Sequence, residues 1–514
     1  MPNNLSNNRR IAKNTFFLYV RMLLVMAVML YTSRVVLKAL GVVDFGIYNA
    51  VGGVVAMLGF LSNSMSNAVQ RFLSYEIGRG STEKISEIFN ASLRVHLAIA
   101  IIVFVVLEVV GIWVLNAKLT IPIDRLSAAN WVFQSAVMSA MFSIMQVPYN
   151  SLIIASEEMK AFAYISIVEV MLKLGITLPL FVFSADRLIL YSILMAIVSI
   201  LVVLCYIGYC LTRYKEAKIR RLRNLQSARE LLGFAGWNML GELAWIFTGQ
   251  GVNLLLNIYF GPVVNAARGL SYQVDAAVNR FVINFQTALN PQIIKTYATN
   301  DFKETLSLLY RGTRFSYYLL LILSLPLIFE MKYVLGLWLD EVPDLTVEFC
   351  QIILVTSFVT CLSNLFATVA KAYGRIKKYQ IVISLVLFLN FPLSLLMLYL
   401  GFGPLITVFV ALSIQILTLV TRMYLLKEMI VYSAINYLSK VVLPLLIISF
   451  LSCIVPTVIT FGMEESLSRF LLNMTLTLCT IIFIIYTIGL SDSERTLILR
   501  TVKTFLSHFR HYGQ

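Results

Sequence analysis

Charged residues are scarce in this sequence and make up only 13% of its 514 residues. Hydrophobic residues make up 59%, and the mean hydropathy is +0.84. This balance lies far outside that of soluble globular domains. The scarcity of charge therefore argues against a soluble protein and predicts a chain that crosses a lipid bilayer many times.

Residues that bind metals or form disulfides are also few. The chain has three histidines, two of them in its last seven residues, and six cysteines scattered through apolar runs without a C-x-x-C spacing. Metal sites and disulfide frameworks need such residues at close, regular spacing. The pattern G-x-x-x-x-G-K-[ST], which cradles nucleotide phosphates, is absent as well. We therefore expect no metal site, no cofactor and no nucleotide-driven motor.

Apolar segments of about 20 residues, the length that spans a bilayer as a helix, follow one another along the whole chain. The first belongs to a basic and then apolar start that continues past the length of a signal peptide, so we interpret it as a retained span. Gly, Pro and charge clusters separate the segments and predict fourteen spans, at residues 16–38, 46–68, 93–115, 128–152, 161–184, 188–211, 231–259, 263–288, 315–337, 347–369, 379–400, 404–425, 439–462 and 469–490.

The distribution of basic residues predicts how these spans are oriented, because Lys and Arg concentrate in cytoplasmic loops. With the N-terminus inside, the predicted cytoplasmic segments hold most of the 41 Lys and Arg, whereas the outside loops carry the acidic turns LDEVPD (339–344) and MEE (463–465). We therefore expect both termini in the cytoplasm. The net charge of +15 is then a topology signal with some attraction to anionic headgroups, and it does not indicate a nucleic-acid partner.

A repeat relates the two halves of the chain. Three pairs are each 216 residues apart: YTSR at 31–34 and FTGQ at 247–250, YNAVGG at 48–53 and VNAARG at 264–269, and Gln70 and Gln286. An offset that spans six helices indicates parallel rather than inverted repeats.

The repeat predicts an all-α polytopic membrane protein with two bundles of six helices each. The predicted parts are an N-terminal bundle at 1–212, a basic cytoplasmic linker at 213–230, a C-terminal bundle at 231–428, and two extra helices with a cytoplasmic tail at 429–514.

Polar residues interrupt the predicted eighth span and share one helix face, since they follow one another at steps of 3, 4, 3, 4 and 7 between residues 265 and 286. The repeat-related second span carries polar and small residues on the matching face. We predict that the two helices line a wet cavity with Asn49, Asn63, Gln70, Asn265, Tyr272, Asn279 and Gln286.

Arginines within the spans are the candidates for substrate binding, because an unpaired guanidinium is costly in a bilayer and its fork of donors suits phosphate oxygens. They outnumber the carboxylates on the inward faces, which favours an anionic diphosphate over a cationic substrate. Glu242 and Asp275 are either counter-ions of the arginines or carboxylates that couple transport to a proton or cation. The candidate arginines are Arg21, Arg34, Arg268 and Arg280.

Other charged residues in the spans have simpler structural interpretations. Glu169 and Lys173 are four residues apart and are expected to form an ion pair. Lys38, Lys332 and Arg469 lie near helix ends, where we expect their side chains to reach the headgroups. Arg34 and Lys38 share a helix face, whereas Arg21 points away from them on an ideal helix.

The segments LYTSRVVLKALGVVDFGIYNAVGGVVAMLGFLSNSMSNAVQRFLSYEIGRG (Leu30–Gly80) and PYNSLIIASEEMKAFAYISIVEVMLKL (Pro148–Leu174) carry a family resemblance. With them, the chain resembles the polysaccharide flippases of the multidrug/oligosaccharidyl-lipid/polysaccharide exporter superfamily, and in particular the O-antigen and capsule branch of lipopolysaccharide biosynthesis proteins typical of Bacteroidetes. The resemblance covers essentially the whole chain.

The resemblance implies a bacterial inner-membrane transport protein that moves undecaprenyl-diphosphate-linked oligosaccharide to the periplasmic leaflet by alternating access, for surface polysaccharide biosynthesis. It implies the lipid-linked substrate and membrane lipids as partners, together with a polysaccharide polymerase and glycosyltransferases. Related flippases line their cavity with arginines from the first, second and eighth helices. Arg21 and Arg34 match the first helix and Arg268 and Arg280 the eighth, whereas the second has only Arg71, at its cytoplasmic end.

Two alternatives remain on the same fold: a multidrug or metabolite cation antiporter, and a flippase for the lipid-linked peptidoglycan precursor. A membrane glycosyltransferase, polymerase or ligase would need a catalytic periplasmic domain or a long loop. The longest predicted outside loop, at 116–127, is too short for that, so we expect a protein that is not an enzyme.

Overall fold

The computed structural model describes most of the chain, and every regular element within the described residues is helical. The described residues are 3–156, 158–183, 185–218, 226, 228–233, 236, 246–373, 376–492 and 494–496. Within these ranges the side chains of residues 3–21, 60, 61, 63, 64, 67, 78, 288, 291, 298 and 376 are not described.

Eleven helical segments of the described part are long and apolar enough to cross a membrane. They are Met22–Gly59, Thr82–Ala117, Ile123–Ala155, Met159–Val182, Arg187–Arg213, Phe302–Phe329, Thr346–Tyr373, Lys377–Tyr399, Ile406–Leu426, Ala434–Gly462 and Leu467–Gly489. The chain is therefore an all-α polytopic membrane protein, which confirms the predicted fold class.

The difference from the fourteen predicted spans arises at three places. Residues 234, 235 and 237–245 of the predicted span at 231–259 lie outside the described residues, so no continuous helix is described there. The predicted eighth span lies in α11 (Pro262–Ala298), which is helical but is not among the segments apolar enough to count. The first two predicted spans fall within α1 (Asn3–Ala56) and the segment after it, where Met22–Gly59 counts as one continuous segment. The count of fourteen stays a prediction.

A single glycine divides α1 into two helices. Gly41 has φ +79° and ψ 168°, outside the helical region, and this positive φ favours glycine because it has no Cβ. The second helix continues through η1 (Met57–Gly59) into α2 (Phe60–Arg79). α2 ends at Arg79 and is capped by Gly80, with φ +71°, so the helical segment runs eleven residues past the predicted end of the second span at residue 68.

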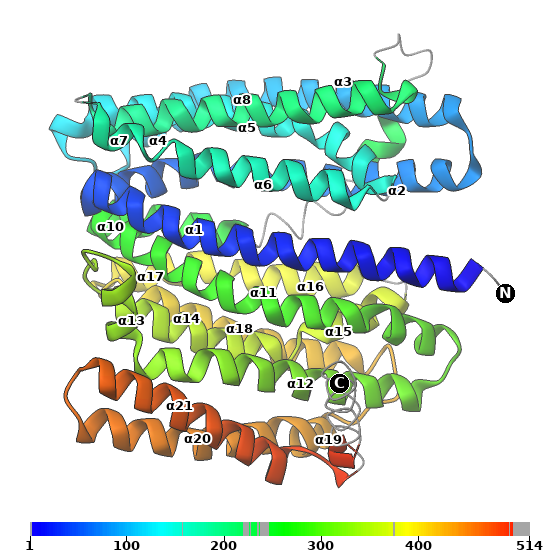
Figure 1. Ribbon diagram of the computed structural model, residues 1–514, viewed down its shortest axis with the longest axis vertical. Coiled ribbons are helices and arrows are strands. Elements are labelled where there is room, and N and C mark those ends of the chain that lie inside the picture. The colour runs from blue at the N-terminus through cyan, green and yellow to red at the C-terminus, as the bar shows by residue number, and fades with distance from the viewer. Residues whose placement is uncertain are drawn as a thin grey trace, which may run out of the picture. The chain divides into compact units, whose positions relative to one another are not determined.

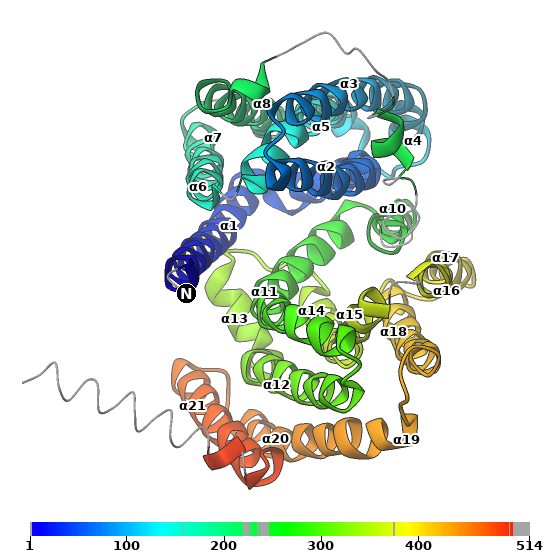
Figure 2. The ribbon, with the colours of Figure 1, turned by 90° about the vertical axis from the view of Figure 1, so that its right-hand side faces the viewer.

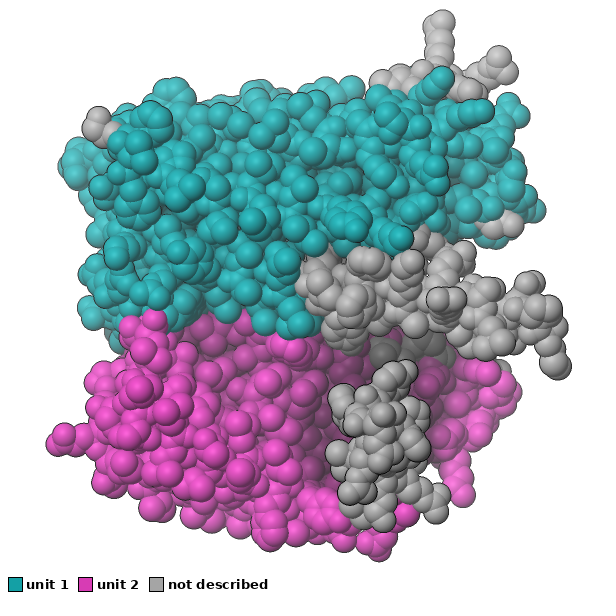
Figure 3. Space-filling view, viewed as in Figure 1, with its two compact units in different colours: residues 1–273, 338–346, 384–410 teal, residues 274–337, 347–383, 411–514 magenta. Residues whose placement is uncertain are grey.

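The chain forms two compact units, and each combines segments that are distant in sequence (Figure 3). Unit 1 comprises residues 1–273, 338–346 and 384–410, and unit 2 comprises residues 274–337, 347–383 and 411–514. The two units group residues that are in contact in space, whereas each predicted bundle is a continuous stretch of the sequence. The predicted bundle boundaries therefore stay a prediction.

Unit 1 is organised around α5 (Leu126–Ala155), which packs against α2, the helix at Thr82–Val106 and the helix at Arg187–Arg213 (Figure 1). The buried rings of Phe89, Phe133 and Tyr206 belong to its core. Besides α1, α2 and α5, it holds α3 (Thr82–Val106), η2 (Leu107–Gly111), α4 (Ile112–Ala117), η3 (Ile123–Arg125), α6 (Met159–Gly175), α7 (Pro179–Val182), α8 (Arg187–Arg213), η4 (Lys215–Ala217), η5 (Phe247–Gly251), α10 (Val252–Phe260), the start of α11, and α17 (Asn390–Tyr399).

Unit 2 contains the last two long helices, α20 (Leu443–Gly462) and α21 (Leu467–Ile484), which pack against each other and against α12 (Phe302–Phe329) (Figure 2). Its other elements are most of α11, α13 (Met331–Trp338), α14 (Thr346–Cys361), α15 (Asn364–Tyr373), α16 (Ile376–Phe388), α18 (Ile406–Leu426), α19 (Ala434–Tyr437), η6 (Leu438–Val442) and η7 (Ile485–Gly489); the ends of α13, α14, α16 and α18 extend into unit 1.

A buried ion pair attaches α21 to the junction of α12 and α13. Arg469 Nη2 lies 3.0 Å from Glu330 Oε2, and the two side chains are 7% and 0% exposed. Asn473 donates to the other Glu330 oxygen at 2.6 Å. The prediction that Arg469 reaches the headgroups is therefore wrong, because a buried carboxylate holds its guanidinium inside unit 2. Lys332 does stay exposed, and it pairs with Glu465 at 2.9 Å.

Candidate functional site

Two cations of α1 share one carboxylate. Arg34 Nη2 lies 2.9 Å from Asp340 Oδ1, and Lys38 Nζ lies 2.6 Å from Asp340 Oδ2. The side chains of Arg34 and Lys38 are 42% and 61% exposed, so solvent reaches both. This contact confirms that Arg34 and Lys38 share a helix face. Both cations therefore lie at accessible positions beside the same carboxylate.

The loop that carries Asp340 is held at both ends by other parts of unit 1. The Trp338 indole N–H donates to the Leu30 carbonyl at 2.8 Å, and the Ser271 hydroxyl donates to the Thr346 carbonyl at 3.2 Å. Leu345 has φ +65°, a left-handed conformation that costs a non-glycine residue on the order of 1 kcal/mol. Such strain persists only where surrounding contacts determine the backbone. The structure therefore positions Asp340 against α1.

The pKa of Asp340 sets the pH range of this contact. Hydrogen bonds from Lys38 and Arg34 lower the pKa of the Asp340 carboxyl below its usual value of 3.8. A carboxyl whose pKa is lower in the folded state than in the unfolded state stabilises the folded contact at pH values above its unfolded-state pKa. This contribution is lost as the pH falls through the folded-state pKa. The ion pairs should therefore be fully formed from pH 5 to pH 8.

We expect hydrogen exchange of residues 338–346, corrected for its intrinsic rate, to be equally protected from pH 5 to pH 8. Protection should fall only in more acidic solution, where the carboxylate is protonated. The variant Asp340→Asn removes the charge and should reduce protection between pH 5 and pH 8 to the level that the unmodified protein shows in more acidic solution. Protection that changes between pH 5 and pH 8 in the unmodified protein would contradict the assignment of this segment to the Asp340 contact.

Arg268, a predicted phosphate ligand, is almost fully buried within unit 1 at 4% exposure. Its Nη1 donates to the carbonyl of Gly249 at 2.9 Å, within the π-helix η5. Its guanidinium also stacks on the Tyr272 ring, 4.8 Å from the centroid. π-helical turns occur often at functional sites. Nε of Arg268 has no hydrogen-bond partner among the described residues. Arg268 thus braces η5 and α11 through its Nη1 and Nη2 groups, and its Nε–H is left without a described partner.

The repeated motifs pack directly against each other in unit 1. A Cβ added to Gly269 would lie 3.1 Å from Asn49 Oδ1, and one added to Gly53 would lie 2.8 Å from Gln250 Oε1. Asn253 donates to the Asn49 carbonyl at 3.4 Å. The small residues of the repeat therefore permit close helix contact here, where the sequence predicts a wet cavity.

Several predicted cavity residues are engaged in helix contacts. Asn265 is fully buried and donates to the Asn253 carbonyl at 2.8 Å, and its place on a wet cavity wall stays a prediction. Gln286 is likewise buried, in unit 2, and lies near Cys361 and Asn364. Hydrogen bonds within these helix contacts satisfy the buried side-chain amides, which would otherwise need water as a partner.

The remaining described residues of the predicted cavity lie partly open. Asn49 donates to the Phe45 carbonyl at 2.8 Å, and Gln70 donates to the Ser66 hydroxyl at 3.0 Å. Tyr272 is 39% exposed, and Arg280 is half-buried on α11. The side chains of Arg21 and Asn63, and all of Glu242, lie outside the described residues.

Asp275 on α11 has neutral partners within unit 2. Its Oδ1 accepts from the Ser357 hydroxyl at 2.6 Å and from the Asn279 amide at 2.6 Å, and Asn279 also donates to Ser357 at 2.9 Å. Among the described residues, no Lys or Arg forms an ion pair with Asp275. The interpretation of Asp275 as a counter-ion for an arginine therefore has no support within the described residues.

Two residues of the candidate site were not identified as such from the sequence. Asp340 belongs to the acidic turn LDEVPD, which we used only as evidence of orientation, and it bonds to a residue 306 positions away. Ser357 is a plain hydroxyl in an apolar span, and nothing in the sequence distinguishes it. The predicted pair of Glu169 and Lys173 is confirmed, at 2.5 Å.

No protein-family model and no curated protein matches this sequence. Solved structures do share its fold. The lipid II flippase MurJ, in its inward closed conformation, has a TM-score of 0.70 and 14% sequence identity, over 92% of this chain and 98% of that chain.

Two transporters of the MATE family are also similar. The Vibrio cholerae MATE transporter VcmN, solved as a mutant, has a TM-score of 0.57 and 19% identity, over 83% of this chain and 98% of that chain. A multidrug resistance MATE family transporter of the MOP superfamily, in an inward-facing conformation, has a TM-score of 0.60 and 12% identity, over 78% and 96% of the two chains. The chain is therefore a multi-pass membrane protein that shares the fold of these solved transport proteins.

Proposed function

We propose that this protein is a flippase that moves an undecaprenyl-diphosphate-linked oligosaccharide from the cytoplasmic to the periplasmic leaflet of a bacterial inner membrane, for surface polysaccharide biosynthesis. The diphosphate binds to arginines, the polyprenyl chain stays in the bilayer, and the protein alternates its access between the two leaflets. Both termini then lie in the cytoplasm. A polysaccharide polymerase and glycosyltransferases are its proposed functional partners.

The observation that carries this proposal is the contact of Arg34 and Lys38 with the single carboxylate of Asp340. Asp340 is an internal anion held between two accessible cations, and a substrate phosphate offers the same cations more oxygens and more charge. A diphosphate can therefore replace the carboxylate. Arg268, Arg280 and Arg21 are the further proposed ligands on the helices that the family resemblance implies.

The fold of MurJ adds support for a lipid-linked substrate, since that protein is described as a lipid II flippase. A second candidate function is cation-coupled antiport, as in a multidrug transporter. Asp275 favours this candidate, because a carboxylate bonded only to a hydroxyl and an amide among the described residues can take up a proton or a cation. The cations at Asp340 favour an anionic substrate and therefore the flippase.

Reconstitution into liposomes separates these functions. We expect the purified protein to transfer fluorescent undecaprenyl-diphosphate oligosaccharide between leaflets at a rate well above that of protein-free liposomes. We expect no expulsion of cationic dyes under an imposed proton or sodium gradient. Dye export without lipid transfer would establish the antiporter instead.

The peptidoglycan alternative needs a cellular experiment. Deletion of the gene for a surface polysaccharide flippase removes that polysaccharide from viable cells, whereas loss of an essential peptidoglycan precursor flippase kills them. We expect viable cells without the surface polysaccharide, and lethality with intact polysaccharide would contradict the proposed substrate.

A further inference from the structure

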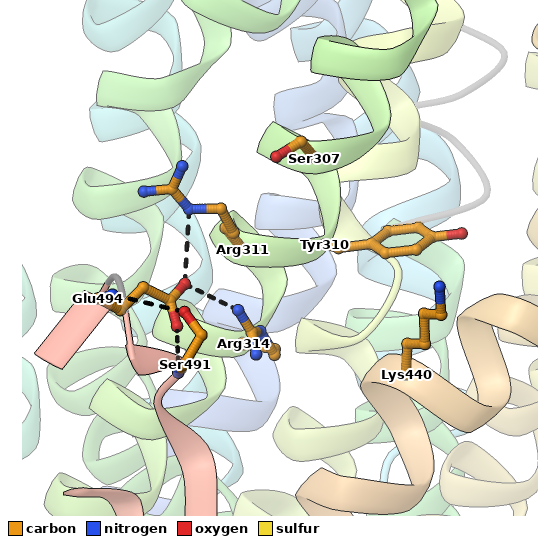
Figure 4. Close-up of a pocket in the computed structure, with 7 residues that line it drawn as sticks. All are labelled: Ser307, Tyr310, Arg311, Arg314, Lys440, Ser491 and Glu494. Carbon is orange, nitrogen blue, oxygen red and sulfur yellow. Dashed lines mark hydrogen bonds and ion pairs between the residues drawn. The ribbon is translucent and has the colours of Figure 1, made fainter.

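Unit 2 contains a pocket of about 570 Å³ that plays no part in the proposed transport site (Figure 4). α12 contributes four lining residues at positions i, i+3, i+4 and i+7, which share one helix face. η6 contributes one lining residue, and the segment after η7 contributes two. The lining residues are Ser307, Tyr310, Arg311, Arg314, Lys440, Ser491 and Glu494.

Glu494 organises the arginines of this pocket and is itself only 6% exposed. Its Oε1 accepts from Arg314 Nη2 at 2.8 Å and lies 3.5 Å from Arg311 Nε. Its Oε2 accepts from the backbone N–H of Ser491 at 2.9 Å. The carboxylate therefore fixes the position of both guanidinium groups, whose other N–H donors have no hydrogen-bond partner in the described part of the chain.

The pocket has more positive charge than negative charge. Three of its lining residues are cationic and one is anionic, so its formal excess is two positive charges. Lys440 is exposed, and no described carboxylate lies within ion-pair distance of it. The Arg311 side chain is 45% exposed. Lys440 and Arg311 are thus accessible cations of the lining, and its uncharged residues carry hydroxyls.

The pocket lies where three predicted spans reach the same side of the membrane. Arg314 directly precedes the predicted span 315–337, Lys440 lies at the start of 439–462, and Ser491 follows 469–490. By the predicted orientation this is the cytoplasmic side. Leu438 and Leu443, on either side of Lys440 along the chain, are 45% and 55% exposed and offer apolar surface beside the charges.

We propose that this pocket binds the phosphate of an anionic phospholipid headgroup from the cytoplasmic leaflet. Arg311 and Lys440 contact the phosphoryl oxygens, and the hydroxyl of Tyr310 supplies a further donor. Arg314, which is hydrogen-bonded to Glu494, adds a positive charge close to the phosphate. The exposed leucines contact the acyl chains. Adjacent apolar surface distinguishes a lipid from free phosphate, which would gain nothing from it.

Lipid binding to the delipidated full-length protein tests this proposal. Native mass spectrometry in detergent would compare phosphatidylglycerol with phosphatidylcholine of the same acyl chains. We expect the unmodified protein to bind phosphatidylglycerol at least about 10-fold more tightly. The double variant Arg311→Gln and Lys440→Gln should weaken this binding about 10- to 30-fold, because each lost surface cation removes a comparable share of the attraction to an anionic lipid.

The double variant Lys371→Gln and Lys378→Gln is the matched control. It also removes two exposed cations from the predicted cytoplasmic side of unit 2 but leaves the pocket intact, so binding should change less than about 2-fold. Equal losses in the two double variants, or equal affinity for both lipids, would overturn the proposal. Inorganic phosphate that binds as tightly as phosphatidylglycerol and displaces it would show a free-phosphate site and overturn the assignment to a headgroup.

Discussion

Replacement of Arg469 with methionine is expected to destabilise the protein by about 3–5 kcal/mol, the cost of removing one partner from a buried ion pair. Glu330 would remain buried at 0% side-chain exposure with its charge uncompensated, and of its described partners only the Asn473 amide would still donate a hydrogen bond to it. Thermal unfolding of the purified protein in detergent, followed by intrinsic fluorescence, would show a large fall in the unfolding temperature.

A double-mutant cycle distinguishes the lost pair from lost packing. Because the cost comes from the orphaned carboxylate, the double variant Glu330→Gln and Arg469→Met should recover most of the lost stability. The exposed pair of Lys332 and Glu465 is the matched control, with a similar distance of 2.9 Å but side chains that are 72% and 43% exposed. Lys332→Met should change stability by less than about 1 kcal/mol. Equal losses for Arg469→Met and Lys332→Met would contradict the importance of burial.

Hydropathy predicted most of the spans because the bilayer imposes a length and a polarity that are both local in sequence. The predicted span at 188–211 corresponds closely to α8, Arg187–Arg213. The break of α1 at Gly41 was harder to predict, since the presence of a glycine does not show that its backbone has a positive φ. The predicted eighth span is helical, but its polar face excludes it from a hydropathy count.

Charged residues near helix ends were predicted less well, because burial depends on distant parts of the chain. Arg469 and Lys332 have the same local character, an ionisable group at the end of an apolar segment. Only the three-dimensional structure shows that Glu330, 139 positions before Arg469, accepts its guanidinium in the interior. The local rule that long basic side chains reach the headgroups holds only where no buried acid competes.

The repeat predicted which helices resemble each other and not how closely they approach. Small residues on a helix face fit either a hollow or a tight contact, since both require the absence of bulk. Asn49 lies against Gly269, so α1 and α11 are in close contact at these two residues of unit 1. The face shared by Arg34 and Lys38 was predicted from helical spacing alone, but their carboxylate partner was not, since it lies on a distant loop.

Replacement of Arg34 with alanine is expected to reduce transfer of the diphosphate-linked lipid by about 10- to 100-fold at subsaturating substrate, because a charge-assisted hydrogen bond to phosphate contributes about 1.5–3 kcal/mol. Arg34→Lys should retain part of the activity, since the charge remains and the fork of donors is lost. Initial rates in liposomes, normalised to the amount of folded protein, measure both effects.

The variant Asp340→Asn tells a substrate ligand from a structural pair. If Asp340 is an internal anion that the substrate replaces, its neutral variant keeps Arg34 and Lys38 in place and removes their competitor. Transfer by Asp340→Asn should then stay within about 2-fold of the unmodified protein or rise, whereas Arg34→Ala remains impaired. If the pair only fixes the loop to α1, both variants break the same contact and lose activity equally. Equal loss would therefore remove Arg34 from the proposed binding site and leave the contact a structural one.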